Sequence, residues 1–216
     1  MAAAAVMLLL VALAFSPSTT NAYDSDPLQD TCVADLKSKL SVNGYPCKTS
    51  PPSAADFVFK GLATPASTNN ANGLGAVFGV VQAFPALNTL GLSIARLDFA
   101  KGGLVPPHTH PRASELFHVL EGTIYAGFIT TDNKLYAATV NKGEVMAFPK
   151  GLIHFQVNAG NSTALAFASL SSQSPGFQLV ANALLGSGIP DGVLSKTLFV
   201  GTNVVDKLKA PFVPKK

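Results

Sequence analysis

The sequence predicts an all-β domain, and two features of residues 76–172 lead to this prediction. Short runs rich in Val, Ile, Leu and Phe follow one another at regular intervals, and turn pairs such as Glu121-Gly122 and Asp132-Asn133 separate them. The composition agrees with many short elements, since there are 18 Gly, 15 Pro and 14 Phe but no Trp. This spacing is typical of a β-sandwich or a small barrel, of which the jelly roll is one form. The expected strands are residues 92–99, 115–120, 123–130, 134–140, 144–148, 154–158 and 164–170.

Residues 1–22 are predicted to be a secretory signal peptide. An apolar run from Met1 to Phe15 precedes a small polar stretch ending at Ala22, and the first charged side chain is Asp24. The run is shorter than the roughly 20 apolar residues that span a bilayer, and the small residues before Tyr23 suit a cleavage site. An uncleaved anchor is the alternative. No other stretch is apolar enough to span a membrane, so we expect a secreted, soluble mature protein.

Residues 23–75 are expected to be irregular, and they carry both cysteines of the chain. The segment is rich in Pro, Ser, Asn and Gly. In an oxidising compartment an even cysteine count predicts a disulfide, here between Cys32 and Cys47. Closing a loop of this size would stabilise the domain by about 3 kcal/mol. Two buried free thiols are the alternative, whereas a metal site would need a second cysteine pair.

Residues 173–216 differ in character from the barrel core, and we expect a helical C-terminal extension there. The periodicity of residues 177–185 and 193–199 is mixed, whereas residues 203–210 favour a helix. The apolar side chains of such a tail must be buried, either on the barrel of the same chain or on a neighbouring subunit. The pattern leaves both arrangements open.

The charge balance argues against nucleic-acid binding. Fifteen Lys and Arg against 12 Asp and Glu give a formal net charge of +3 over 216 residues, and the lysines gather only in a short C-terminal tail. Such a charge provides no surface for a polyanion. The sequon Asn161-Ser162-Thr163 lies in a turn-like stretch and predicts N-glycosylation at Asn161.

Three of the four histidines form a pattern with one glutamate: His108, His110, Glu115 and His154. Residues two apart on a strand point to the same face, so His108 and His110 can converge on one ion. Glu115 shares its face of the following strand with apolar residues and can therefore point into the barrel. His154, on a later strand, can close the site from across the barrel.

Three imidazoles and one carboxylate suit a divalent Mn, Fe, Co, Ni or Zn ion and leave positions open for water or a substrate. The alternative is that these histidines only pack in a β core. That alternative is preferred for His118, which lies on the opposite face from Glu115 and is expected to be a partly buried non-ligand. Gln156 and Asn158 share the face of His154 and are candidates for hydrogen bonds around the ligands.

The pattern resembles a known family. Residues 102–122 and 143–158 match the two motifs of the cupin superfamily, and further segments resemble the plant germins and germin-like proteins. These segments are Gln29-Asp30-Thr31-Cys32-Val33-Ala34-Asp35, Pro106-Pro107-His108-Thr109-His110-Pro111-Arg112-Ala113-Ser114-Glu115 and Phe148-Pro149-Lys150-Gly151-Leu152-Ile153-His154-Phe155-Gln156. The likeness covers the whole chain.

The resemblance implies a cupin jelly-roll β-barrel with a helical C-terminal extension, and manganese held by His108, His110, Glu115 and His154. It implies hexamers built as trimers of dimers, and residence in the plant apoplast or cell wall. It also implies superoxide dismutase activity, with a role in defence or wall oxidation. The residues by which true germins bind oxalate correspond here to Ala95 and Val105 instead of two asparagines. Losing each amide would cost roughly 1–3 kcal/mol, so oxalate oxidation is not expected.

Two other functions remain open at this point. One is a non-enzymatic cell-wall receptor or binding protein. Its weak support is Lys142-Gly143-Glu144, which occupies the place of an adhesion-like tripeptide in relatives, although a plain hairpin turn is the preferred interpretation. The other is a nucleotide-sugar pyrophosphatase, for which Arg96 and Arg112 are the only candidate phosphate ligands.

Overall fold

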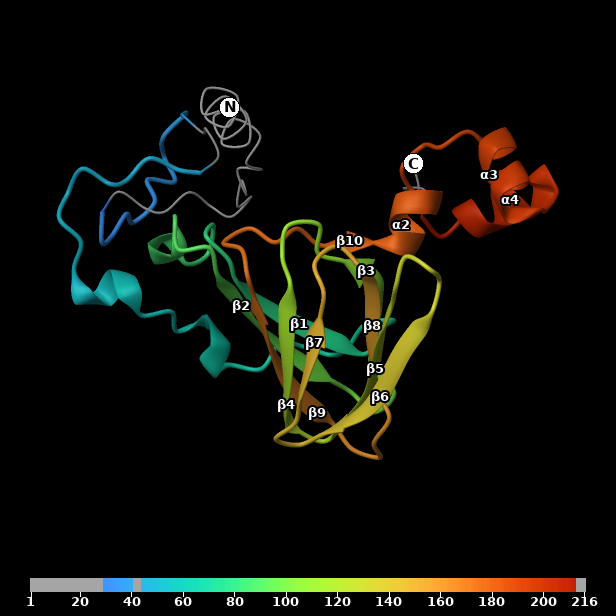
Figure 1. The fold of residues 1–216 in the computed structure, drawn as a ribbon, viewed down its shortest axis with the longest axis horizontal. Coiled ribbons are helices and arrows are strands. Elements are labelled where there is room, and N and C mark those ends of the chain that lie inside the picture. The colour runs from blue at the N-terminus through green and yellow to red at the C-terminus, as the bar shows by residue number, and fades with distance from the viewer. Residues whose placement is uncertain (1–28, 41–43, 213–216) are drawn as a thin grey trace, which may run out of the picture.

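The computed structural model describes residues 29–40 and 44–212, so the predicted signal peptide lies outside the described residues. The predicted all-β fold is confirmed. Two five-stranded antiparallel sheets form a barrel in the centre of the molecule (Figure 1). Their strand orders are β1-β2-β9-β4-β7 and β10-β3-β8-β5-β6. The strands are β1 (Leu74–Gly79), β2 (Ser93–Phe99), β3 (Leu104–Thr109), β4 (Glu115–Glu121), β5 (Thr123–Ile129), β6 (Leu135–Asn141), β7 (Val145–Phe148), β8 (Ile153–Asn158), β9 (Ala164–Leu170) and β10 (Gln178–Leu179).

The period-2 pattern of the sequence determines which side chains fill the barrel. Along β4, Phe117 and Val119 are fully buried. Leu116, which directly precedes Phe117, points outward and is exposed. The ring of Phe117 packs edge-on against the ring of Phe99, which ends β2 of the same sheet. Burying a large apolar side chain contributes roughly 1.5–3 kcal/mol. The seven expected strands are all present, and each bound lies within one residue of its expected position.

The N-terminal segment is closed on itself by the predicted disulfide, and a backbone hydrogen bond joins it to the connection between β1 and β2. Cys32 and Cys47 are bonded, which confirms the pairing, and Ala34 forms an isolated bridge with Cys47. Ala34 N also donates to Pro85 O (3.0 Å). The regular elements of this part are short 3-10 helices: η1 (Ala54–Phe57), η2 (Gly61–Ala63) and, between β1 and β2, η3 (Pro85–Leu87).

The turn at Lys142-Gly143-Glu144 links the two sheets, so the expected hairpin is wrong. β6 pairs with β5 in one sheet, and β7 pairs with β4 in the other. Gly143 has a φ of 87°, a region that favours glycine, and its N–H donates to Val119 O (2.8 Å). The tripeptide is therefore accounted for by the geometry of a crossover between sheets.

The C-terminal helices begin later than the expected boundary at residue 173. Residues 173–179 still belong to the barrel, because Gln173 O accepts a hydrogen bond from Val81 N and β10 pairs with β3. The helices are α2 (Val180–Leu185), α3 (Asp191–Leu198) and α4 (Thr202–Lys209). In Figure 1, α3 and α4 lie together beyond α2, away from the sheets. Within the described ranges no helix has the length and apolar character needed to cross a membrane.

Candidate metal centre

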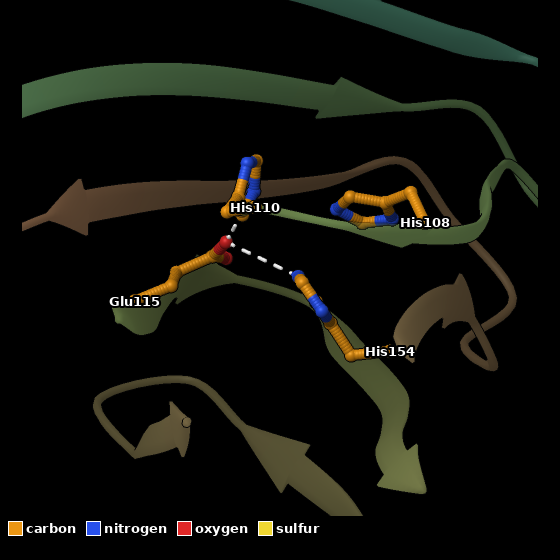
Figure 2. Close-up of side chains that lie close together, drawn as sticks. All are labelled: His108, His110, Glu115 and His154. Carbon is orange, nitrogen blue, oxygen red and sulfur yellow. Dashed lines mark ion pairs between the residues drawn. The ribbon is translucent and has the colours of Figure 1, made fainter. Parts of the chain in front are cut away.

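The four predicted ligands meet between the two sheets. His108 on β3 and His154 on β8 are direct cross-strand partners in one sheet, and His110 directly follows β3. Glu115 begins β4 of the facing sheet. Figure 2 shows the three imidazoles and the carboxylate converging on one point. One donor atom from each residue lies within 4.8 Å of those of the others, and all four side chains are buried.

A bulge in β3 aims the first histidine pair. The pairing of β3 with β8 shifts register between Val105 and His108, where Pro106 and Pro107 intervene. Proline lacks the N–H that a regular ladder needs, so it occurs at such irregularities, and its fixed φ limits the freedom of the segment. Because of this shift, Val105 and His108 are both buried although they lie three residues apart, while Thr109 donates to Gly151 O (2.7 Å).

Strand β8 inverts the usual pattern of a barrel strand. Its fully buried side chains are polar, namely His154, Gln156 and Asn158, whereas the apolar residues between them are only partly buried. Burying polar groups costs free energy unless they are paired or bind a ligand. The inverted pattern on this strand therefore indicates a site inside the barrel.

Each imidazole is oriented by a backbone carbonyl at its Nδ1 atom. His108 Nδ1 lies 2.9 Å from Pro106 O, His110 Nδ1 lies 2.6 Å from Gly176 O, and His154 Nδ1 lies 2.8 Å from Leu152 O. A carbonyl only accepts, so each Nδ1 carries the proton and donates it. In the neutral tautomer, the lone pair then resides on Nε2, which is the arrangement that metal-binding histidines use.

The Nε2 atoms and the carboxylate determine the charge at the centre. His110 Nε2 lies 2.9 Å from Glu115 Oε2. Burial alone would lower the pKa of His110, but Glu115 and the Gly176 carbonyl raise it above its usual range. Burial would likewise raise the pKa of Glu115, yet His110 and His154 outweigh burial and lower it to about 2. Burial, together with the neighbouring His154, lowers the pKa of His108 to about 3.

These residues fit a divalent cation. His154 Nε2 is buried and has no hydrogen-bond partner within the described residues, although it lies 3.4 Å from Glu115 Oε2. His108 is neutral and Glu115 is ionised at neutral pH, so both can bind metal without losing a proton. Glu115 raises the pKa of His110, and a protonated imidazole cannot bind metal, so metal affinity should fall in acid.

The other predicted side chains have different surroundings. His118 is partly buried outside the cluster, as expected. Asn158 Nδ2 donates to Ala100 O and Ser162 O, and its Oδ1 accepts from Gly160 N, so its bonds hold turns at the far end of β8. Gln156 lines the cavity beside the metal ligands.

The predicted glycosylation site is consistent with its surroundings. Asn161 is exposed in the turn between β8 and β9. A glycan at this position would extend into solvent, and glycosylation at Asn161 stays a prediction.

Two residues of the segment before β10 that contact the site were not predicted from the sequence. The carbonyl of Gly176 orients His110, and the ring of Phe177 lies 4.7 Å from the ring of His108. Arg112 holds this segment through its Nε atom, which donates to Ser174 O (2.6 Å). The available signal was Pro175-Gly176, a turn pair followed by an aromatic residue, but the expected boundary at 173 assigned it to the helical tail.

A cavity of about 450 Å³ opens beside the metal ligands. His108, His110 and Glu115 line it, together with Ala95 and Val105, the two positions that correspond to the oxalate-binding asparagines of true germins. Val105 is the cross-strand partner of Gln156. The remaining lining is mostly apolar, so the metal centre faces an apolar chamber with few hydrogen-bonding groups.

The barrel, with its histidine–glutamate cluster between two antiparallel sheets, defines the chain as a cupin. The cupin family model matches residues 60–206. The chain is 50% identical over 215 residues to Germin-like protein 5-1 of Oryza sativa subsp. japonica, which covers 99% of this chain and 96% of the relative. It is 46% identical over 219 residues to Germin-like protein subfamily 2 member 1 of Arabidopsis thaliana, covering 100% of both chains. The chain belongs to the germin-like proteins of the cupin family.

Solved structures agree with this assignment. A structure described as giving structural and spectroscopic insights into the mechanism of oxalate oxidase has a TM-score of 0.82 and 44% identity, and the match covers 87% of this chain and 96% of the other. Recombinant oxalate oxidase in complex with glycolate has a TM-score of 0.83 and 42% identity, with 88% and 98% covered. The fold of this chain is therefore that of the germin and oxalate oxidase structures.

Proposed function

We propose that this chain is a secreted, manganese-dependent superoxide dismutase of the plant apoplast or cell wall. The observation that carries the proposal is the buried cluster of His108, His110, Glu115 and His154, whose donor atoms converge within 4.8 Å. The ligand set suits Mn, Fe, Co, Ni or Zn, and the resemblance to germins favours manganese among them. When bound, manganese supplies a one-electron redox couple, which the conversion of two superoxide ions and two protons to oxygen and hydrogen peroxide requires.

The chain's own residues provide three things for this reaction. Backbone carbonyls hold the three imidazoles in one tautomer, so little reorganisation is needed when the site is filled. Glu115 adds one negative charge, which tunes the potential of a redox ion. The cavity gives a very small substrate access to the centre without requiring a set of anion-binding donors.

Secretion is supported by three features of the chain. The disulfide Cys32–Cys47 is of the kind that persists in oxidising compartments. Residues 1–22 have the composition of a secretory signal peptide, and the exposed Asn161 is placed where a glycan would extend into solvent.

The test measures manganese content and superoxide dismutation on the same purified, glycosylated protein. We expect close to one manganese per chain and a dismutation rate that rises in proportion to the bound manganese. Full manganese occupancy without dismutation or oxalate turnover would contradict the enzymatic proposal. It would favour the non-enzymatic alternative, a cell-wall binding protein that keeps the metal for stability.

Oxalate oxidation is the second candidate, because the two similar solved structures are of oxalate oxidase. The residues that line the cavity argue against oxalate oxidation by this chain. Ala95 and Val105 are buried in the cavity wall and offer no hydrogen bond to a dianion. A buried anion left with unpaired oxygens loses roughly 1–3 kcal/mol for each missing hydrogen bond.

The double substitution Ala95→Asn with Val105→Asn is therefore expected to raise oxalate turnover. Two restored amides correspond to roughly 2–6 kcal/mol, or at least about 30-fold in kcat/KM. The measurement is peroxide release from oxalate by manganese-loaded protein. The control is Ala95→Leu with Val105→Leu, because leucine branches as asparagine does but carries no amide, and this variant should stay inactive. High oxalate turnover by the unmodified protein would contradict the assignment of these positions.

We also propose that the chain assembles as a homo-oligomer, in line with the hexamer that the resemblance implies. α3 and α4 lie away from the sheets, and Phe199, at the end of α3, is 93% exposed in the single chain. A large apolar side chain exposed to this extent, beside exposed Val193 and half-exposed Leu198, indicates a surface that a neighbouring subunit covers.

The substitution Phe199→Asp is expected to lower the molecular mass of the particle. An aspartate would have to be buried without a partner in the subunit interface, which costs more free energy than the interface contact contributes. Light scattering after size-exclusion chromatography measures the mass of the variant and of the unmodified protein. Equal masses for both would contradict the role assigned to Phe199.

A nucleotide-sugar pyrophosphatase receives no support from the two candidate arginines. Arg96 is bonded to Asp98 (2.8 Å) and to Leu62 O (3.0 Å). Arg112 donates to Ser174 O. Asp98 neutralises Arg96, which leaves Arg112 as a single cation held by a neutral carbonyl, so the two arginines do not form a pyrophosphate site.

A further inference from the structure

The cavity beside the metal ligands is large for anions as small as superoxide or oxalate. Its volume of about 450 Å³ lies within the range of 300–1,000 Å³ that is typical of pockets for organic ligands. An apolar cavity of about 150 Å³ already holds a benzene molecule. Leu97, Ile94 and Leu170 are among the apolar side chains of its wall. The size and lining suit a small organic molecule with an apolar body.

One buried amide in this cavity lacks a partner. Gln156 is 1% exposed, and its Oε1 atom has no hydrogen-bond partner within the described residues. The side chain lies on β8 two residues after the metal ligand His154, and it lines the cavity. Leaving a buried acceptor unpaired is unfavourable, so this amide is a position at which a ligand hydroxyl can donate a hydrogen bond.

Few other polar groups are available to a ligand in the cavity. Apart from the metal ligands, Arg112 is the only charged side chain that lines it among the described residues, and its Nε atom donates to Ser174 O. A dicarboxylate needs several donors at both ends of the molecule. A ligand with one hydroxyl group at one end matches the observed lining better than a dianion does.

Two aromatic rings stand at the opening. Phe78 and Phe177 line the cavity, their ring centroids are 6.2 Å apart, and they are 42% and 46% exposed. The ring of Phe177 also lies 4.7 Å from the ring of His108. Half-exposed phenylalanines beside a cavity favour a planar apolar ligand, because aromatic pairs gain stacking or edge-to-face contacts in addition to buried area.

We propose that this cavity binds a small phenol, a single aromatic ring bearing one hydroxyl group. The ring contacts the apolar wall and Phe177, and the hydroxyl group points toward the amide of Gln156 and the metal cluster. The proposal rests on the proposed metal site but not on its dismutase activity. It identifies Gln156 as a residue that positions the ligand.

Titration with 4-methylphenol, followed by the NMR signals of its ring protons, tests the proposal on manganese-loaded protein. Bound Mn²⁺ broadens the signals of nuclei near it, so binding in this cavity gives saturable broadening with one site per chain. We expect Gln156→Leu, which keeps the size of the side chain, to weaken binding about tenfold, as loss of one hydrogen bond does. Gln178→Leu is the matched control, because Gln178 is exposed on β10, and its binding should be unchanged.

Three outcomes would overturn the proposal. The first is the absence of saturable binding by the unmodified protein. The second is equal affinity in the Gln156→Leu variant. The third is displacement of 4-methylphenol by lower concentrations of oxalate than of phenol. Metal content is measured separately, and saturation-transfer signals report binding without manganese, so failure of the manganese assignment is distinguishable from failure of phenol binding.

Discussion

The His108→Ala substitution is expected to abolish metal binding and dismutation while the barrel stays folded. The imidazole supplies one of four ligands, and its Nε2 lone pair is directed at the centre by the bond from Nδ1 to Pro106 O. Even the loss of a side chain that only hydrogen-bonds to a metal ligand lowers metal affinity by about 10–100-fold. Loss of a ligand itself should therefore cost at least about 100-fold. Elemental analysis of dialysed protein measures the bound metal, and circular dichroism checks the fold.

The fourth histidine provides the matched control. His118 lies on the same strand as Glu115, but it is partly buried on the opposite face and is not part of the cluster. His118→Ala should keep its metal and its activity. If His108→Ala retains stoichiometric metal, or if both variants lose it equally, the assignment of the ligands is wrong.

The Phe117→Ala substitution is expected to destabilise the fold by about 3–5 kcal/mol, the usual cost of truncating a buried phenylalanine. Phe117 is fully buried in the barrel, and its ring centroid is 6.5 Å from that of Phe99 and 6.2 Å from that of Phe148. Its removal leaves a cavity between the two sheets. The measurement is the free energy of unfolding from denaturant titration.

Phe57→Ala controls for the change of residue type. Phe57 ends η1 in the N-terminal segment and is 40% exposed, so its truncation should cost clearly less than that of Phe117. A loss below about 1 kcal/mol at Phe117 would show that the two sheets are not stabilised by this part of the core.

The strands and their inward-facing residues could be predicted from the sequence, because both follow from the alternation of side chains within each strand. In β4, the apolar residues Phe117 and Val119 define the inner face, and Glu115 follows from them as an inward-pointing carboxylate. The same alternation places His154 inside on β8. The ligand set was predictable because each ligand lies within, or directly next to, a strand that its sequence pattern indicates.

Other features depend on contacts between distant segments, which a local pattern does not contain. The turn at Lys142–Glu144 looks like a hairpin, yet its two strands pair with different partners, so it crosses between sheets. The carbonyl of Gly176 reaches His110 across 66 residues of sequence. Asn158 shares a face with His154, but its hydrogen bonds are made at the far end of the strand.

The four candidate metal ligands and the residues that line the adjacent cavity indicate different aspects of function. The histidine–glutamate cluster indicates metal chemistry in general, whereas Ala95, Val105 and Gln156 determine what can lie beside the metal. A shared fold does not by itself transfer an activity. The apolar lining of the cavity is therefore the feature that most directly limits which molecules the proposed site can take.

Anomalous X-ray diffraction from crystals of the purified protein, recorded on both sides of the manganese absorption edge, tests the central claim most directly. The account predicts one strong anomalous peak per chain, present only above that edge, at about 2.0–2.3 Å from Nε2 of His108, His110 and His154 and from a carboxylate oxygen of Glu115. No peak among these four side chains, or a peak that persists below the manganese edge, would contradict it.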